Sequence, residues 1–342
     1  MTDPSQRRIV CFGEMLLRLS PPQGELLMQG DALSVRPGGA EMNVAASLAC
    51  LGAPVRVATV LPDNPLGHGA RDELRRRGVE VSSVVFRPGR MGLYFMTPGA
   101  VRRPSEVLYD RADSAFARHC DTAFTWSDVL GDASWLHVSG VTPAIGPAGG
   151  RAAIQAVEAA EKAGVQVSFD GNFRSRLWNE WSGDPASTLG RMLAAASVAF
   201  ADERDFALVL GQTFSGSDPH ERRRSAAAAA FRAFPRLERI CCTVREQDGV
   251  TAHSLSAVML ARQDEIHAPA IRMEGVVDRV GGGDAFAAGV LFGLWNSWSD
   301  VRALTFGLHA AGLKHSVHGD FNPFSAAEVE AAVAAEGFDI RR

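Results

Sequence analysis

A carboxylate that follows three consecutive glycines is the strongest candidate for chemistry in this sequence. In the segment VVDRVGGGDAFAAGVLFGL, Gly281, Gly282 and Gly283 precede Asp284, which opens an alanine-rich apolar run typical of a buried helix. The glycines expose backbone N–H groups, and with the dipole of the following helix they can form an anion site. Asp284 could then take a proton from a hydroxyl that attacks phosphorus. A plain turn with Asp284 as the helix N-cap explains this motif alone equally well.

A second glycine pair lies near the start of the chain. Gly38 and Gly39 precede a helix that we expect from about 40 to 51, and Asn43 lies one helical turn further on. Glycine lets a ligand approach the backbone closely, and an asparagine side chain can hydrogen-bond a polyol. Taken alone, however, this motif favours an ordinary turn into a helix with an exposed asparagine.

Two arginines and an acidic group follow expected strands. Arg111 and Arg174 carry the planar guanidinium group that suits a carboxylate or a phosphate, although each could be an ordinary surface arginine. Asp202 and Asp205 could hold Mg²⁺ through waters, because Mg²⁺ at phosphate sites needs few protein carboxylates. An acidic helix N-terminus, which the helix dipole stabilises, explains the same two residues without a metal.

Composition and missing motifs exclude other classes of function. The net charge is −4, and the arginine runs at 75–77 and 222–224 lie in polar helical segments, so we expect no nucleic-acid partner. No GxSxG, GxGxxG or GxxxxGK[ST] motif occurs, and His315 and His318 have no evident third zinc ligand. Cysteines without CxxC spacing, a polar N-terminus and no long apolar run predict a cytoplasmic protein without membrane contact.

The elements that must position these residues predict an α/β fold. Expected strands alternate with helices, which indicates a central, mainly parallel sheet with helices on both faces. These strands span 135–140, 165–170, 197–202 and 239–244. Ligands bind such sheets at the carboxyl ends of the strands, where Arg174, Asp202 and Asp205 fall.

Two segments have a different character, with short strands and turn-forming residues but no amphipathic helix. We expect residues 15–36 and 85–112 to form a small protruding β-sheet, a lid over the α/β core made of 1–14, 37–84 and 113–342. Because its strands are apolar, the lid could pair across a homo-oligomer.

The two glycine motifs together resemble the two signatures of the ribokinase-like (PfkB) carbohydrate kinases. The resemblance is carried by PGGAEMNVAASLACLGA and VVDRVGGGDAFAAGVLFGL, in this order, and it extends over essentially the whole chain. The segments GLYF, YDRADSA, FDGNFRSRLW, TVRE and GDFN are similar to the subgroup that acts on 2-keto-3-deoxygluconate. The resemblance implies a ribokinase-like fold and the transfer of the γ-phosphate of ATP to the C6 hydroxyl of this sugar acid.

The resemblance also implies residue roles. Asp284 would be the base, and the N–H groups of Gly281, Gly282 and Gly283 would bind the transferring phosphoryl group. The implied substrate contacts are Gly38, Gly39, Asn43, Tyr94, Tyr109, Arg111, Arg174 and Asp284. The implied nucleotide contacts are Asp202, Thr243, Arg245, Gly281, Gly283, His309 and Asn322. Mg²⁺ would bridge the ATP phosphates near Asp202 and Asp205, and a need for a monovalent cation stays open.

Two arginines favour a sugar acid, while three departures from the family pattern limit the inference. Burying an unpaired cation is costly, and a neutral sugar offers Arg111 and Arg174 no charge to pair with. The family's usual signature has alanine at the position of Gly282, its NxxE element appears here as DERD, and TVRE replaces a glycine-containing turn. A kinase for a neutral sugar such as fructose or ribose, and a non-catalytic sugar-binding regulator, remain alternatives.

Overall fold

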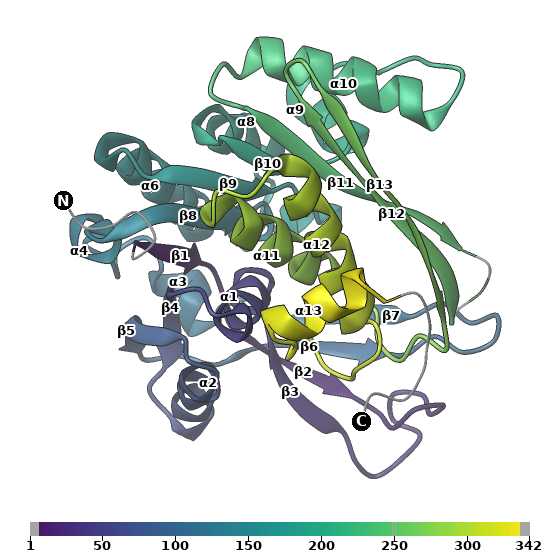
Figure 1. Ribbon diagram of the computed structural model, residues 1–342. Helices are drawn as coiled ribbons and strands as arrows, with labels where there is room; N and C mark the ends of the chain where they lie inside the picture. The colour runs from purple at the N-terminus through teal and green to yellow at the C-terminus, as the bar shows by residue number, and fades with distance from the viewer. Residues whose placement is uncertain (1–6, 248, 250, 336–342) are drawn as a thin grey trace.

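The computed structural model describes residues 7–247, 249 and 251–335 (Figure 1). The two ends of the predicted core, 1–6 and 336–342, lie outside the described residues. None of the helices in the described part of the chain is long and apolar enough to span a membrane. All five cysteines have free thiols, in keeping with the expectation from their spacing.

A sheet of nine strands, in the order β13-β12-β11-β10-β9-β8-β1-β4-β5, forms the centre of the molecule. Its strands are β1 (Arg8–Phe12), β4 (Val55–Pro62), β5 (Glu80–Arg87), β8 (Ala133–Ser139), β9 (Gln166–Asp170), β10 (Val198–Phe200), β11 (Arg239–Gln247), β12 (Ala252–Ala261) and β13 (Glu265–Glu274). Neighbouring strands from β11 to β5 are parallel, and β12 and β13 add an antiparallel hairpin at one edge. The predicted, mainly parallel sheet is confirmed; the hairpin was not foreseen.

Helices cover both faces of this sheet (Figure 1). One apolar core contains residues of α3 (Ala115–His119), α4 (Trp126–Leu130), α5 (Val141–Ala144), α6 (Pro147–Ala163), α7 (Ser175–Trp181), α8 (Pro185–Ala195), α9 (Glu203–Leu210) and α10 (Pro219–Ala233). The other contains residues of α1 (Ala40–Leu51), α2 (Pro65–Arg76), α11 (Gly282–Trp295), α12 (Asp300–Lys314) and α13 (Ala326–Val333). The alanine-rich α11 is buried almost throughout because it lies between the sheet, α1 and α12.

A separate four-stranded sheet forms below the core in Figure 1. It has the order β3-β2-β6-β7, built from β2 (Leu16–Ser20), β3 (Ser34–Gly38), β6 (Gly92–Thr97) and β7 (Glu106–Asp110). The strands β2 and β6 are parallel, and the two outer pairs are antiparallel. This small sheet comes from the two segments in which a lid was expected, although β3 continues to Gly38 and residues 85–87 still belong to β5 of the large sheet.

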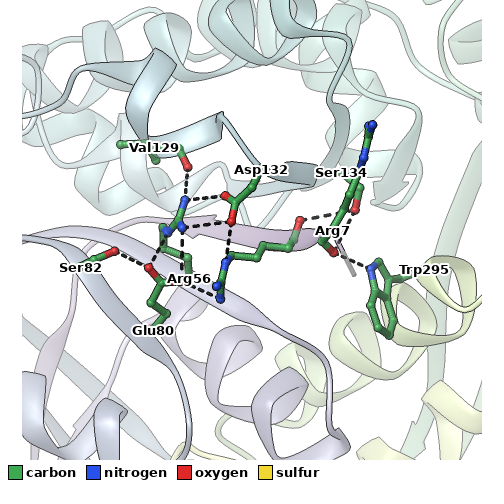
Figure 2. Close-up of polar contacts among 9 residues, drawn as sticks. Arg7, Arg56, Glu80, Ser82, Val129, Asp132, Ser134 and Trp295 are labelled. Atoms are coloured by element: carbon green, nitrogen blue, oxygen red, sulfur yellow. Dashed lines mark hydrogen bonds and ion pairs between the residues drawn. The ribbon is translucent and has the colours of Figure 1, made fainter. Parts of the chain in front are cut away.

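Four charged side chains form a cluster at the amino-terminal edge of the parallel strands, which we call the amino-edge cluster: Arg8, Arg56, Glu80 and Asp132 (Figure 2). Arg8 Nη1 lies 2.6 Å from Glu80 Oε2, and Arg8 Nε donates to Asp132 Oδ2 at 2.7 Å. Arg56 donates to the same two carboxylates and to the carbonyl of Val129. Every charge in this cluster therefore has two partners of opposite sign.

Candidate active site

Asp284 lies in the first turn of α11, at the carboxyl side of the large sheet. The N-cap of α11 is Gly281, and no side chain caps the helix. The interpretation of Asp284 as an N-cap is therefore wrong, because its carboxylate is directed elsewhere. Oδ2 of Asp284 accepts a 2.7 Å hydrogen bond from Nδ2 of Asn43 in α1, so the two glycine motifs, far apart in sequence, meet at this contact.

The three glycines before Asp284 differ in what they contact. Gly281 has a φ of 81°, and a Cβ there would lie 2.0 Å from the carbonyl oxygen of Asp320, so only glycine fits. The N–H of Gly282 donates to the carbonyl of Arg279 at 3.2 Å. Within the described chain, the N–H groups of Gly283 and Asp284 have no backbone acceptor. These N–H groups, at a helix N-terminus, are the ones free to bind an anion.

The environment of Asp284 suits a proton acceptor. Burial raises the pKa of its carboxyl to about 7, and the nearby charge of Asp320 adds to this rise. The hydrogen bond from Asn43 favours the charged form and lowers the pKa in part. Asn43 is 3% exposed, and its Oδ1 is buried without a hydrogen-bond partner among the residues that the structure describes. A buried amide oxygen without a donor costs stability unless a ligand supplies one. A hydroxyl group of a bound ligand would satisfy it.

A cavity of about 780 Å³ opens beside Gly283. It brings together several predicted site residues from the carboxyl ends of neighbouring strands: Arg174, Asp202, Asp205, Thr243, Arg245 and Gly283. The side chains of Phe173, Phe200, Leu208 and Phe286 provide apolar wall. Of the predicted nucleotide contacts, His309 in α12 and the fully buried Asn322 do not line this cavity.

Three carboxylates, those of Asp170, Asp205 and Asp284, lie at this carboxyl edge, and the charge of Arg174 lowers the pKa of each. Burial raises the pKa of Asp205 to about 6, and it raises that of Asp170 well above its ordinary value, with further increases from Asp284 and Asp205. Asp170 ends β9 and was not singled out from the sequence; its position directly after a strand and before Arg174 was the available signal. Carboxylate oxygens of this kind are suitable ligands for a divalent cation.

Asp202 and Asp205 also have the structural role that the sequence left open. Asp202 caps α9 by accepting from the N–H of Arg204 at 2.8 Å, and Asp205 accepts from the N–H of Asp202 at 2.9 Å. Both carboxylate oxygens of Asp202 contact the Arg204 side chain as well. Among the described residues only Oδ2 of Asp205 accepts a hydrogen bond, which leaves Oδ1 available, so of the two residues Asp205 is better placed to hold a metal.

The two predicted arginines have different surroundings. Arg111 is 5% exposed and is paired with the buried Glu14, whose Oε2 accepts from Arg111 Nε at 2.8 Å. Arg174 is exposed and lines the cavity, and within the described part of the chain its side chain donates only to the neighbouring carbonyl of Phe173. The argument from an unpaired buried cation therefore does not apply to Arg111, because Glu14 already balances its charge. Arg174 is the arginine with free donors.

A second charged group links the small sheet to the glycine loop; we call Arg18, Tyr94, Asp278 and Asp320 the buried charge cluster. Arg18 of β2 donates from Nη1 to Asp278 Oδ2 at 2.7 Å and to Asp320 Oδ1 at 3.1 Å, and the hydroxyl of Tyr94 donates to Asp320. All four side chains are buried. The ring of Tyr94 also lies beside that of Tyr109, tilted by 45° with ring centroids 6.3 Å apart. The predicted contact Tyr94 thus directs its hydroxyl to the protein itself.

Gly38 and Gly39, two of the predicted substrate contacts, lie where the backbone packs closely against Asp320 and Glu14. A Cβ at Gly38 would lie 2.2 Å from the Asp320 carboxylate, and Gly39 has a φ of 133° with Glu14 O only 2.2 Å from a Cβ. The backbone here must approach Asp320 and Glu14 closely, so both positions require glycine whether or not a ligand binds.

Comparison with known proteins supports the family resemblance over the whole fold. Residues 6–327 match the model of the pfkB family carbohydrate kinases. The chain belongs to the PfkB family. It is 34% identical over 324 residues to 2-dehydro-3-deoxygalactonokinase of Haloferax volcanii, covering 94% of this chain and 95% of that protein. It is 26% identical to 2-dehydro-3-deoxygluconokinase of Bacillus subtilis, covering 92% of this chain and 91% of the other.

A solved structure of the same kind agrees with this PfkB fold. The crystal structure of 2-dehydro-3-deoxygluconokinase from Thermotoga maritima superposes with a TM-score of 0.90 at 35% identity, over 96% of this chain and all of that one. The ribokinase-like fold and the small separate sheet are confirmed. The chain is a carbohydrate kinase, and these relatives carry names of 2-keto-3-deoxy sugar acid kinases.

One departure from the common PfkB signature has a structural reason. A methyl group at Gly282 would lie 2.6 Å from Cε1 of His315. His315 is 2% exposed, and its Nδ1 lies 2.6 Å from the carbonyl oxygen of Ala311, so the ring is held in this position. The imidazole of His315 occupies the space in which an alanine side chain would otherwise fit.

Proposed function

We propose that this PfkB kinase transfers the γ-phosphate of ATP to the C6 hydroxyl of 2-keto-3-deoxygluconate. The product is 2-keto-3-deoxy-6-phosphogluconate. The names of the Bacillus and Thermotoga relatives support this substrate, and ATP is the phosphate donor of the family. The observation that carries the proposal is the Asp284–Asn43 pair beside the free N–H groups of α11.

The pair supplies the base and its alignment. Asp284, with a pKa raised by burial to about 7, takes the hydroxyl proton as the oxygen attacks phosphorus. Asn43 holds the carboxylate through Nδ2 and offers its unpartnered Oδ1 to the sugar. The N–H groups of Gly283 and Asp284 bind the phosphoryl oxygens, so that positioning and charge stabilisation lower the barrier.

The acidic edge of the cavity is the place that fits Mg²⁺. Asp205 has an oxygen to spare, and Asp170 has a pKa raised by burial and by its acidic neighbours, whereas Asp202 is engaged by Arg204. Asp205 and Asp170 would hold the ion through water. When bound, the ion neutralises charge on the ATP phosphates. Arg174, at the same cavity, is the cation available to the substrate carboxylate.

A substrate panel tests the proposal. Phosphorylation of 2-keto-3-deoxygluconate, its galactonate epimer, fructose and ribose is followed by coupled ADP detection. The proposal predicts that kcat/KM is highest for 2-keto-3-deoxygluconate. The 34% identity to the Haloferax enzyme favours the galactonate epimer as the second candidate. A preference for fructose or ribose would contradict the assignment to sugar acids.

The Arg174→Ala variant tests the role of the carboxylate. Loss of a charged pair costs about 2–5 kcal/mol, so kcat/KM for the keto acid should fall by roughly 30-fold or more, with little change for any neutral sugar. Arg176→Ala is the matched control, because Arg176 is an exposed arginine two positions away. Equal losses on acid and neutral substrates would contradict the pairing.

The Asp284→Asn variant tests the base. It should lower kcat by roughly 10²-fold or more and leave ATP binding nearly unchanged, because the amide keeps the shape but cannot take the proton. Isothermal titration with a non-hydrolysable ATP analogue checks the binding. A fully active Asn variant, or one that no longer binds the nucleotide, would refute this assignment.

We also propose a homo-oligomer in which the small sheets of two copies meet. Val35 on β3 and Leu108 on β7 are 58% and 59% exposed, and both lie on outer strands of that sheet. Sedimentation equilibrium should give more than one copy, and Leu108→Arg should shift the protein to monomer. A monomeric wild type at micromolar concentration would contradict this contact.

A further inference from the structure

Two histidines and a glutamate lie together outside the cavity of the candidate active site, at the edge of the large sheet. His220 is in the first turn of α10, and Glu265 and His267 alternate along β13, the outermost strand. Residues two apart on a strand point to the same side of the sheet, so both face the helix. Figure 1 shows α10 lying beside the end of the β12–β13 hairpin.

The donor atoms of these three side chains converge. Nε2 of His220 is 2.5 Å from Glu265 Oε1, and Nε2 of His267 is 3.0 Å from the same oxygen. All three atoms lie within 4.8 Å of one another, and the two rings stack at 5.5 Å between centroids. Two donors bound to a tetrahedral zinc ion at ~2.0–2.1 Å are about 3.3 Å apart. Small side-chain movements therefore bring the three atoms to the spacing of zinc ligands.

The contacts within the group do not have the geometry of hydrogen bonds. Oε1 of Glu265 is buried, lies next to two ring nitrogens, and accepts no hydrogen bond from either. The other oxygen, Oε2, lies 3.2 Å from Nε of Arg224, one helical turn after His220. A carboxylate that ligates a metal through one oxygen is commonly oriented by such a partner on the other.

We propose that His220 Nε2, Glu265 Oε1 and His267 Nε2 form a Zn²⁺ site that links α10 to β13. Two imidazoles and one carboxylate suit Zn²⁺, whereas Mg²⁺ and Ca²⁺ prefer oxygen ligands. The histidine side chains are 42% and 53% exposed, which leaves the fourth position open to water.

The site is structural and takes no part in phosphoryl transfer. It joins a helix to an edge strand, whose outer N–H and C=O groups are otherwise a site for unwanted pairing with other chains. A metal that binds only the folded chain also raises its stability. The three ligands share no residue with the cavity beside Gly283.

Metal titration of the full-length chain tests the proposal. The protein is stripped with a chelator and titrated with Zn²⁺ in the absence of ATP, with binding measured by calorimetry and stability by thermal unfolding. We expect one Zn²⁺ per chain and a Tm that rises with Zn²⁺ concentration. Co²⁺ should give the visible absorption of a tetrahedral ion.

The variants His267→Asn and Glu265→Gln should each remove this response. Loss of a direct ligand should weaken binding by more than the roughly 10–100-fold that loss of an outer partner costs. His318→Asn is the matched control, because His318 is exposed and lies outside the group. Circular dichroism of the stripped proteins shows whether each variant is folded, and a variant that does not fold is replaced by the other.

Two results would overturn the site. In one, wild type binds Zn²⁺ no more tightly than the folded variants. In the other, each variant is less stable than wild type by the same amount in chelator as in Zn²⁺. That result would mean that the three side chains form only an ion pair. Kinase activity in Mg²⁺ and ATP should be the same in His267→Asn as in wild type, so a failure of the proposed function leaves this test unaffected.

Discussion

The charged side chains at the two ends of the parallel sheet differ in how they are paired and in the direction of their pKa shifts. At the amino end, Arg8, Arg56, Glu80 and Asp132 pair with one another (Figure 2). Burial alone would raise the pKa of Glu80 and Asp132, but hydrogen bonds and the two guanidinium groups lower both below their usual values. At the carboxyl end, Asp170 and Asp205 line a cavity that opens beside Gly283, Asp284 follows Gly283, and the pKa values of all three carboxyl groups are raised.

The difference shows which end of the sheet has charge available for a ligand. A carboxylate with two arginine partners has no charge left to offer, and its low pKa makes it a poor proton acceptor near neutral pH. A carboxylate with a raised pKa takes up protons readily, and a nearby cation or a donating hydroxyl group stabilises its charged form. The charges at the amino end are therefore engaged with one another, whereas those at the carboxyl end are available to a ligand.

The largest expected effect comes from removing one arginine from the buried charge cluster, and the matched change removes one from the amino-edge cluster. The two variants should differ clearly in folding stability. Arg18→Met leaves Asp278 and Asp320 buried without their guanidinium partner, which should cost about 3–5 kcal/mol of folding stability. Arg8→Met removes a 34%-exposed partner from the amino-edge cluster and should cost at most about 1 kcal/mol. Urea unfolding of both variants measures the two losses.

The pH dependence of the Arg18→Met loss checks its cause. Burial raises the pKa of Asp320, and removing Arg18 removes a charge that lowers it. A carboxyl with a folded pKa above its unfolded pKa destabilises the folded state as pH rises, so the loss should shrink at lower pH. Equal losses for Arg18→Met and Arg8→Met, or a loss that does not change with pH, would contradict the comparison.

Weakening a hydrogen bond to one carboxylate at each end should give a smaller, pH-dependent effect. Asn43→Ala removes the donor that favours the charged form of Asp284, so the pKa of Asp284 should rise. The proposed base Asp284 would act in its unprotonated form, so kcat/KM should increase with pH through about 7 in wild type, and this rise should shift to higher pH in the variant. At neutral pH the loss should be about tenfold.

Ser82→Ala is the matched change at the amino end. The Ser82 hydroxyl donates to Glu80 Oε1 at 2.5 Å, and its removal should raise the pKa of Glu80 without changing the pH profile of activity. A pH–rate profile for each variant is the measurement. If Asn43→Ala lowers activity by the same factor at every pH, Asn43 contacts the substrate without tuning Asp284.

Much of this contrast could be foreseen from the sequence, because local patterns determine elements and parallel strands place their carboxyl ends together. The helix from 40 to 51 and the position of Arg174, Asp202 and Asp205 at the carboxyl ends of the strands followed from such patterns. Pairing between distant side chains did not follow, because no local pattern records it. Glu14 neutralises Arg111 and Arg18 binds Asp278, yet each pair joins segments whose contact depends on the complete fold.

Gly282 is a position at which a distant contact explains a local residue choice. Gly282→Ala would bring a methyl group 2.6 Å from His315 Cε1, and overpacking of this kind costs about 1–3 kcal/mol. Gly69→Ala in α2 is the control, because a Cβ there meets nothing within 4 Å. The exposed helical Gly69 should instead gain roughly 0.5–1 kcal/mol on becoming alanine.

A double-mutant cycle with His315→Ala identifies the contact. If the cost of Gly282→Ala arises only from the clash between the new methyl group and the His315 ring, the substitution should cost little stability once the ring is absent. The coupling energy should then approach the loss seen for Gly282→Ala alone. The free energies of unfolding of all four proteins give this coupling. Additive losses would mean that the backbone of the glycine turn requires Gly282. In that case His315 would not explain why this PfkB signature has glycine in place of alanine.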